Sequence, residues 1–145
     1  MNTKTALITG VGPGTGSALA RRFAAGGYRV AMLARNGERL AALQAELPGS
    51  RSYACDVTDP GVLAATLDAV VADMGPPAVV VHNAVGGAFG NFLDIDPTVL
   101  ERNFQVNVMA LLHLARHLSP AMVAAGEGAI VVTGNTSALR GKANF

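Results

Sequence analysis

Glycine occupies four of the seven positions from Gly10 to Gly16, and this cluster constrains the fold more than any other feature. It follows a short apolar run, Thr5–Thr9, that predicts a strand, and it precedes a helical pattern over Ser17–Ala25. Glycines let a backbone turn sharply and approach a ligand closely, and the helix that follows offers unpaired N–H groups and a positive dipole end. The order strand, glycine turn and helix therefore predicts a site for a diphosphate group.

The remaining chain alternates between short apolar runs and longer helical patterns. Strands are predicted at Tyr28–Leu33, Ser52–Cys55, Ala78–Val81 and Ala129–Thr133. Helices are predicted at Glu38–Leu47, from Thr58-Asp59-Pro60 to Met74, and at Pro97–Ala125 with a break near Pro120. Apolar strands that alternate with helices indicate a parallel sheet covered on both faces. We therefore predict one α/β domain over residues 1–145, a Rossmann-like doubly wound parallel sheet with strand order 3-2-1-4-5.

Folds of this type usually carry a sixth strand, whereas the sequence stops twelve residues after the fifth predicted strand. We expect the chain to be the N-terminal part of a longer domain, without its last strands and helices. The long helix carries apolar residues on more than one side, around Leu111, Leu112 and Leu114.

Composition narrows the classes of partner. Eleven basic residues nearly balance ten acidic ones and no Lys/Arg run occurs, which argues against nucleic acid and anionic membranes as partners. No uninterrupted apolar stretch approaches the roughly 18 residues of a membrane span, and the N-terminus lacks a signal-peptide pattern. The single Cys55 fits a reducing compartment. We expect a cytoplasmic protein.

The spacing of the glycines separates several nucleotide-binding motifs. A P-loop needs Gly-Lys-Ser/Thr, and the segment contains no lysine; the Gly-x-Gly-x-x-Gly spacing also fails, because it meets Thr15 or Ser17. The segment matches Thr-Gly-x-x-x-Gly-x-Gly, and the chain there resembles the short-chain dehydrogenase/reductase family. An extended-subgroup nucleotide-sugar epimerase is disfavoured because its glycine spacing is tighter. The resemblance implies that the cofactor phosphates and the adenosine ribose are surrounded by Gly10, Gly12, Pro13, Gly14, Thr15 and Gly16.

The end of the second predicted strand bears on which nicotinamide cofactor is bound. NAD sites use an acidic residue here to hold the ribose hydroxyls. This chain has Ala34 at that position and Arg35 next to it. A guanidinium can hold a 2′-phosphate through two hydrogen bonds, so Arg35 favours NADP(H) over NAD(H). Pro13 argues slightly against NADP(H), because many NADP-dependent members of the family carry a basic residue at this position.

Two further turns resemble family motifs. Asp56-Val57 follows the third predicted strand, and the resemblance implies contact with the adenine edge. After the fourth strand the chain reads His82-Asn83-Ala84-Val85-Gly86, where the family usually has Asn-Asn-Ala-Gly. Asn83 and Ala84 match, whereas His82 and Val85 depart from the pattern. The resemblance implies that the backbone of Asn83, Ala84 and Val85 passes close to the cofactor ribose.

Catalytic residues are carried over from the resemblance alone. Asn107 takes the place of an Asn that supports a water-linked proton relay, and an Asn on an apolar helical face must find partners for its amide. The serine that orients the substrate carbonyl aligns with Asn135, and Ser137 is an alternative two residues later. The Tyr-x-x-x-Lys pair has no counterpart, because Tyr28 and Tyr53 are not followed by Lys four residues on. We expect these 145 residues alone to be inactive.

Two functions remain open. The leading hypothesis is an NADP(H)-dependent oxidoreductase that moves hydride between the nicotinamide and a carbonyl or secondary-alcohol substrate. The alternative is an atypical or non-catalytic NADP(H)-binding protein, a sensor or structural subunit, which Asn135 in place of serine supports. Tyr-x-x-x-Lys beyond Phe145 would favour the enzyme.

His113 and His117 lie one helical turn apart without an obvious third ligand, so no metal is predicted. The resemblance implies a homodimer or homotetramer.

Overall fold

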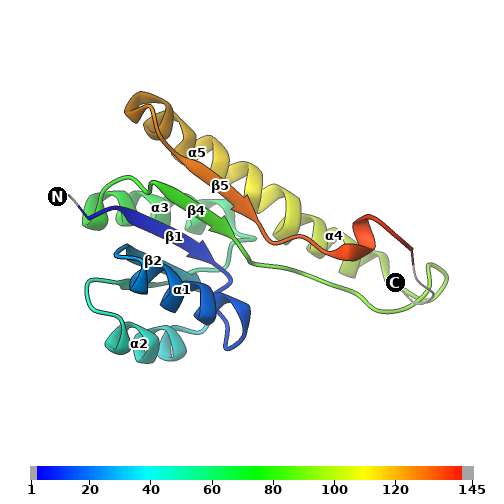
Figure 1. Ribbon diagram of the computed structural model, residues 1–145. Helices are drawn as coiled ribbons and strands as arrows, with labels where there is room; N and C mark the ends of the chain where they lie inside the picture. The colour runs from blue at the N-terminus through cyan, green and yellow to red at the C-terminus, as the bar shows by residue number, and fades with distance from the viewer. Residues whose placement is uncertain (1–2, 142–145) are drawn as a thin grey trace.

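Five parallel strands form one sheet in the order β3-β2-β1-β4-β5 in the computed structural model, which describes residues 3–141 (Figure 1). The strands are β1 (Thr5–Thr9), β2 (Arg29–Ala34), β3 (Arg51–Ala54), β4 (Val79–His82) and β5 (Ala129–Val132). Every pairing is parallel, which confirms the predicted fold class and strand order. The chain runs outward from β1 to β3 and then returns to β4 beside β1. The direction of winding therefore reverses between β1 and β4, where sheets of this kind bind ligands at their carboxyl ends.

Helices cover both faces of the sheet (Figure 1). They are α1 (Thr15–Ala25), α2 (Gly37–Glu46), α3 (Pro60–Met74), α4 (Pro97–Phe104), a π-helical turn η1 (Gln105–Met109), α5 (Ala110–Ala125) and a short 3₁₀ turn η2 (Thr136–Ala138). Because successive strand residues point to opposite faces, Leu7 and Val80 belong to a core with α3 and α5. Ile8 and Val81 belong to a second core with α1 and α2. The sheet is therefore doubly wound, as predicted.

Local caps begin three of the helices. The Asn36 side chain accepts a hydrogen bond from the Arg39 amide at the start of α2. The Asp59 carboxylate accepts from the amides of Gly61 and Val62 at the start of α3, where Pro60 takes the first helical position. Asp96 does the same for Thr98 at the start of α4. The start of α3 is the one predicted from the sequence, and the predicted strand and helix ends differ from the observed ones by at most two residues.

The long helical segment differs from its prediction. No break occurs at Pro120, which lies inside α5. A proline removes the hydrogen bond to the carbonyl four residues earlier, here that of Arg116. Both residues are exposed, so water can satisfy this carbonyl. The irregular turn is η1 instead, and it contains Asn107.

Helix α5 buries one face and leaves the rest exposed. Ala110, Leu114, Leu118 and Met122 are buried and belong to the core with α3. By length and composition alone, the continuous helix 97–125 is also long and apolar enough to cross a membrane, a test that core helices of soluble proteins pass as well. The absence of a membrane partner therefore stays a prediction, as does the homo-oligomer.

Candidate functional site

The glycine bend between β1 and α1 is held by contacts that leave no room for side chains at two of its glycines. Gly10 has a φ of +68°, and a Cβ there would lie 2.5 Å from the Ala84 Cα. A Cβ at Gly16 would overlap the Gly10 carbonyl oxygen and lie 2.7 Å from the Val11 Cα. These two glycines are required by the packing of the protein itself. Gly12 and Gly14 differ, because a Cβ at either position would meet no atom within 4 Å.

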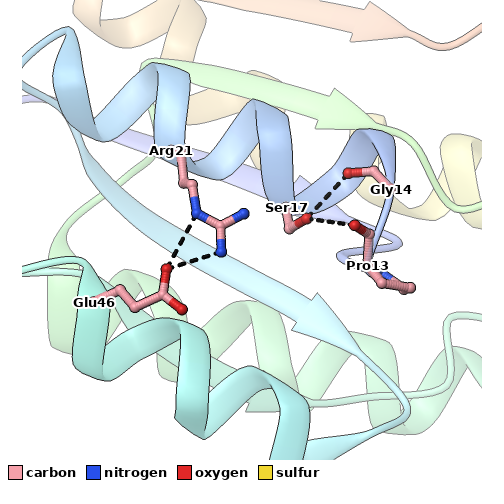
Figure 2. Close-up of polar contacts among 5 residues, drawn as sticks. All are labelled: Pro13, Gly14, Ser17, Arg21 and Glu46. Carbon is pink, nitrogen blue, oxygen red and sulfur yellow. Dashed lines mark hydrogen bonds and ion pairs between the residues drawn. The ribbon is translucent and has the colours of Figure 1, made fainter.

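The start of α1 is fastened to the bend through Ser17 (Figure 2). Its hydroxyl lies 3.1 Å from the Pro13 carbonyl oxygen and 3.0 Å from that of Gly14. Farther along the helix, Arg21 pairs with Glu46 at 2.8 Å and connects α1 to α2 (Figure 2). No side chain caps α1, and no hydrogen bond among residues 3–141 uses the N–H groups of residues 14–16. The first turn therefore offers free donors and a positive dipole end to an anion.

A cavity of about 990 Å³ lies at the carboxyl end of the sheet. All the predicted cofactor-binding residues except Pro13 line it: Gly10, Gly12, Gly14, Thr15, Gly16, Arg35, Asp56, Val57, Asn83, Ala84 and Val85. Pro13 is exposed and contributes its carbonyl to Ser17 instead. The three residues predicted for catalysis, Asn107, Asn135 and Ser137, do not line the cavity. The structure thus brings the turns after β1, β2, β3 and β4 together around one cavity.

Two arginines and an amide line the cavity where β2 ends. Arg35 follows the last residue of β2, and Asn36 and Arg39 lie at the start of α2. No acidic side chain of α2 lines the cavity, although Glu38 lies in the first turn of this helix. The end of β2 therefore presents a cationic wall that suits a phosphate group better than a sugar hydroxyl.

Asp56 after β3 combines a local role with a place in the cavity wall. Its Oδ1 accepts hydrogen bonds from the amide and the hydroxyl of Thr58, at 3.0 and 2.8 Å. Its Oδ2 lies 4.0 Å from a guanidinium nitrogen of Arg102 on α4. The Thr58 hydrogen bonds, then the charges of Arg35 and Arg102, hold the pKa of Asp56 below its ordinary value of 3.8. Asp56 is therefore ionised near neutral pH and links the two sides of the cavity electrostatically.

Thr9, at the end of β1, connects the glycine bend to the turn after β4. Its hydroxyl oxygen accepts hydrogen bonds from the amides of Asn83 and Ala84, both at 3.2 Å, and lies 2.9 Å from His82 Nδ1. The Asn83 amide group donates to the Gly10 carbonyl at 2.9 Å and accepts from the Thr133 hydroxyl at 2.9 Å. Hydrogen bonds to the Thr9 hydroxyl and from the Asn83 side chain therefore hold the backbone of Ala84 close to Gly10.

Asn107 forms a reciprocal pair with the backbone of Gly86. Its Oδ1 accepts from the Gly86 amide and its Nδ2 donates to the Gly86 carbonyl, each at 2.9 Å. A Cβ at Gly86 would overlap Asn103 Oδ1 and lie 3.2 Å from the Asn103 Cα, so a side chain here would require Asn103 to move. Both polar groups of Asn107 are therefore paired with the loop after β4, although the residue is exposed and not buried on an apolar face as expected. Its predicted role in a proton relay remains a prediction.

Asn135 and Ser137 lie on an exposed segment after β5. The Asn135 Oδ1 accepts from the amide of Ser137 at 2.9 Å and from its hydroxyl at 2.6 Å. This pairing caps the short turn η2. The structure brings these two candidates to each other and not to the cavity, and it does not separate their predicted roles.

Sequence reasoning did not assign five polar residues of the cavity wall to the site, namely Asn36, Arg39, Arg102, Asn103 and Thr133. On α4 and η1 the lining residues are Val99, Arg102, Asn103 and Val106. Their spacing of three, four and seven residues marks one helix face, which the sequence already displayed. Arg39 could have been found four residues after Arg35, one helical turn further on.

Several other candidates lie away from the cavity. Tyr53 donates to Asp73 at 3.0 Å, and Tyr28 packs edge-on against Phe23, so neither tyrosine lines the cavity. Cys55 is the exception, because it lines the cavity; it is buried, and burial raises the pKa of its thiol. His117 pairs with Asp68 at 3.0 Å, and within residues 3–141 no three potential metal ligands cluster.

Comparison with known proteins places the chain in a family. The family model for short chain dehydrogenases matches residues 4–145. D-erythrulose reductase of Gallus gallus is 35% identical over 129 residues, which cover 88% of this chain and 51% of that protein. A metagenomic short-chain oxidoreductase in complex with NADP has a TM-score of 0.91 at 33% identity, covering 97% of this chain and 66% of its own.

NAD⁺-bound xylitol dehydrogenase is equally similar in fold, with a TM-score of 0.91, 33% identity, and coverage of 99% of this chain and 57% of its own. The chain spans about half the length of the curated relatives it matches. The glycine bend, the strand order and the turn after β4 agree with this match over the described residues. The chain belongs to the short-chain dehydrogenase/reductase family.

Proposed function

We propose that this chain supplies the cofactor-binding half of an NADP(H)-dependent oxidoreductase that acts on a carbonyl or secondary-alcohol substrate. One observation carries the proposal. The glycine bend has two positions closed by the protein's own backbone and two positions open to the cavity, beside unpaired amides at a helix start. This arrangement suits a diphosphate, because a flat backbone and free N–H groups can approach its oxygens.

The residues around the bend divide the work of binding. Amides at the start of α1 hold the diphosphate, and Arg35, with Arg39 near it, receives a 2′-phosphate at the end of β2. Asp56 and Val57 border the adenine, and the backbone of Asn83 and Ala84 borders a ribose. Bound NADP(H) supplies the hydride or accepts it.

The preference for NADP(H) rests on charge. A 2′-phosphate adds negative charge that Arg35 and Arg39 can neutralise, whereas NADH offers hydroxyls to the same wall. NADP-bound and NAD-bound structures are both similar to this chain, so the overall fold alone does not decide between the cofactors.

The test is a fluorescence titration of the full protein with NADPH and NADH. NADPH should bind more tightly, and Arg35→Ala should raise its Kd by about tenfold or more while changing that of NADH little. Arg22→Ala, which removes the same charge from the end of α1 away from the cavity, is the matched control. Equal affinities of the wild type for the two cofactors, or an unchanged Kd for NADPH in Arg35→Ala, would contradict the NADP(H) preference.

A second function is favoured by one specific observation. Asn135 stands where the family's serine is expected, and both Asn135 and Ser137 bond to each other outside the cavity. A dinucleotide-binding protein without turnover, a sensor or structural subunit, needs only the cradle and not these residues. Tight NADPH binding without oxidation by any small ketone or aldehyde in a broad panel would support this function. Turnover of any panel substrate would support the oxidoreductase.

A further inference from the structure

His82 contacts two separate parts of the site with one imidazole ring. It is the last residue of β4 and is 2% exposed. Its Nδ1 lies 2.9 Å from the Thr9 hydroxyl, directly before the glycine bend. Its Nε2 lies 2.9 Å from the carbonyl oxygen of Val106, directly before Asn107 in η1. The ring therefore joins the cofactor-facing ends of β1 and β4 to the π-helical turn.

The hydrogen bonds around Thr9 determine where the ring proton lies. A hydroxyl oxygen has two lone pairs and one proton. The amides of Asn83 and Ala84 occupy both lone pairs of the Thr9 hydroxyl, so its proton must go to His82 Nδ1. Nδ1 is then an acceptor without a proton. Nε2 carries the proton and donates it to the Val106 carbonyl, which can only accept. The ring is therefore neutral, in its Nε2–H form.

A proton added to Nδ1 would break this network. Nδ1–H would then face a hydroxyl whose lone pairs are filled and whose own proton has lost its acceptor. Burial already lowers the pKa of His82, while the Val106 hydrogen bond opposes the shift. The groups that contact the ring from β1 and η1 are the hydroxyl of Thr9 and the carbonyl of Val106, and the amide of Thr133, directly after β5, donates to the His82 carbonyl. None of these three groups gains or loses a proton in the acidic range in which His82 becomes protonated.

The charged side chains of the site are those that line the cavity. They are Arg35, Arg39, Asp56 and Arg102. None of them contributes to the pKa shift of His82 among the described residues. Asp56 titrates below its ordinary 3.8, so it stays charged throughout the range in which His82 changes.

We propose that neutral His82 is a positioning residue, which holds the ends of β1 and β4 against η1 and so sets where the glycine bend and the Asn83-Ala84 backbone meet the cofactor. This inference rests on the proposed function, because alignment of these backbones matters for binding only if a dinucleotide occupies the cavity. His82 itself does not line the cavity, so it acts through Thr9 and Val106. Protonation of His82 should then weaken cofactor binding.

The protonation state can be tested without any cofactor. In the full protein labelled with nitrogen-15 in its histidines, ring spectra should show His82 as the Nε2–H form at neutral pH. Loss of its signals in His82→Asn assigns them. A charged ring at neutral pH, or an even mixture of the two neutral forms, would overturn the proposal.

The consequence for binding is tested by titrating NADH from about pH 8 down to the lowest pH at which the protein stays folded, because the pKa of His82 lies below its ordinary value. NADH is the probe because it has no 2′-phosphate that titrates in this range. The wild type should lose about tenfold in affinity as the pH falls. His82→Asn, which keeps one acceptor and one donor but does not titrate, should bind with little pH dependence. His113→Asn, which alters a histidine outside the cavity, should retain the wild-type profile.

His82→Phe keeps a ring of similar shape without either hydrogen bond, and its Kd should be raised about tenfold at every pH. An equal pH dependence in His82→Asn and the wild type would overturn the proposal, as would wild-type affinity in His82→Phe. If His82→Phe does not fold, the pair of wild type and His82→Asn decides. If the wild type binds neither cofactor at any pH, the proposed function fails and this inference fails with it. If the wild type binds cofactor and the His82 variants bind it as the wild type does at every pH, the inference about His82 fails and the proposed function stands.

Discussion

The glycine bend after β1 and the segment after β5 lie at the same end of the sheet but are held very differently. The bend is fixed by backbone contacts from β2 and from the turn after β4, including the Val11 amide on the Leu33 carbonyl at 3.2 Å. The segment after β5 is exposed throughout, and its Asn135 bonds to Ser137 two residues away. The comparison teaches that the cavity proposed to hold the cofactor is built by packing within residues 3–141. The predicted carbonyl-orienting positions are not fixed by these residues.

The largest effect is expected inside the bend itself. Gly10→Ala should destabilise the fold by on the order of 3 kcal/mol, because it combines a positive φ with a clash against backbone atoms. Gly12→Ala should change the free energy of unfolding by less than about 0.5 kcal/mol, since its methyl group meets open space. The same methyl should raise the Kd for NADPH about tenfold or more, because it faces the cavity.

Urea unfolding and cofactor titration of both variants separate the two roles. Similar unfolding free energies for Gly10→Ala and Gly12→Ala would show that the bend is not held as described. Unchanged NADPH affinity in a folded Gly12→Ala variant would show that the ligand does not approach this part of the backbone.

A matched pair of valines compares the packed strand β4 with the exposed strand β5. Val80 is 0% exposed and Val132 is 46% exposed. Val80→Ala should cost about 2 kcal/mol through lost burial and a residual cavity. Val132→Ala should cost less than about 1 kcal/mol, because much of its surface already meets water. Equal losses in urea unfolding would mean that β5 is covered in the protein in solution, and the contrast between the two regions would fail.

A smaller effect is expected at the link between η1 and the loop after β4. Asn107→Ala removes both hydrogen bonds to the Gly86 backbone and should cost about 1 kcal/mol, since the site is exposed to water. Hydrogen exchange at the Gly86 amide should become faster. Asn107→Asp keeps the acceptor for this amide and serves as the control. An unaltered exchange rate in Asn107→Ala would show that the loop is held by other contacts.

The smallest effect concerns the other edge of the sheet, at β3, where Tyr53 contacts Asp73. Burial and then this hydrogen bond raise the pKa of Tyr53 to about 12 from its ordinary value of 10.0. The folded protein therefore keeps a proton that the unfolded chain loses between these values. This contribution to stability is intact below pH 10.0 and disappears as the pH rises toward about 12.

Ultraviolet absorbance of tyrosinate during a pH titration follows this group directly. Tyr53→Phe should remove the late-ionising component, and Asp73→Asn should move it to lower pH. If no tyrosine of the wild type ionises well above pH 10, the packing of Tyr53 on β3 against Asp73 on α3 is contradicted.

Features of this fold that depend on residues close together in the chain could be predicted from the sequence. Asn36 and Asp59 cap helices within three residues of themselves, and apolar runs bounded by glycine and proline marked the strands. The sheet order followed because apolar strands that alternate with helices have few ways to wind. The wall at Arg35 was predictable for the same reason, since it directly follows β2.

Other features depend on distant contacts and could not be read from the sequence. All four glycines of the bend look alike in sequence, yet Gly10 is closed by Ala84, which lies 74 residues away, and Gly12 is open. Proline suggested a break near Pro120, whereas the irregular turn lies at η1, where no residue type marks it. The two hydrogen bonds of His82 reach elements that only the folded sheet brings together.

The most direct test of the cofactor cradle is a crystal structure of the full protein with NADPH. We expect the diphosphate to lie against the amides of residues 14–16 and the 2′-phosphate against Arg35. An empty bend, or a bend whose backbone points away from the bound cofactor, would contradict this expectation.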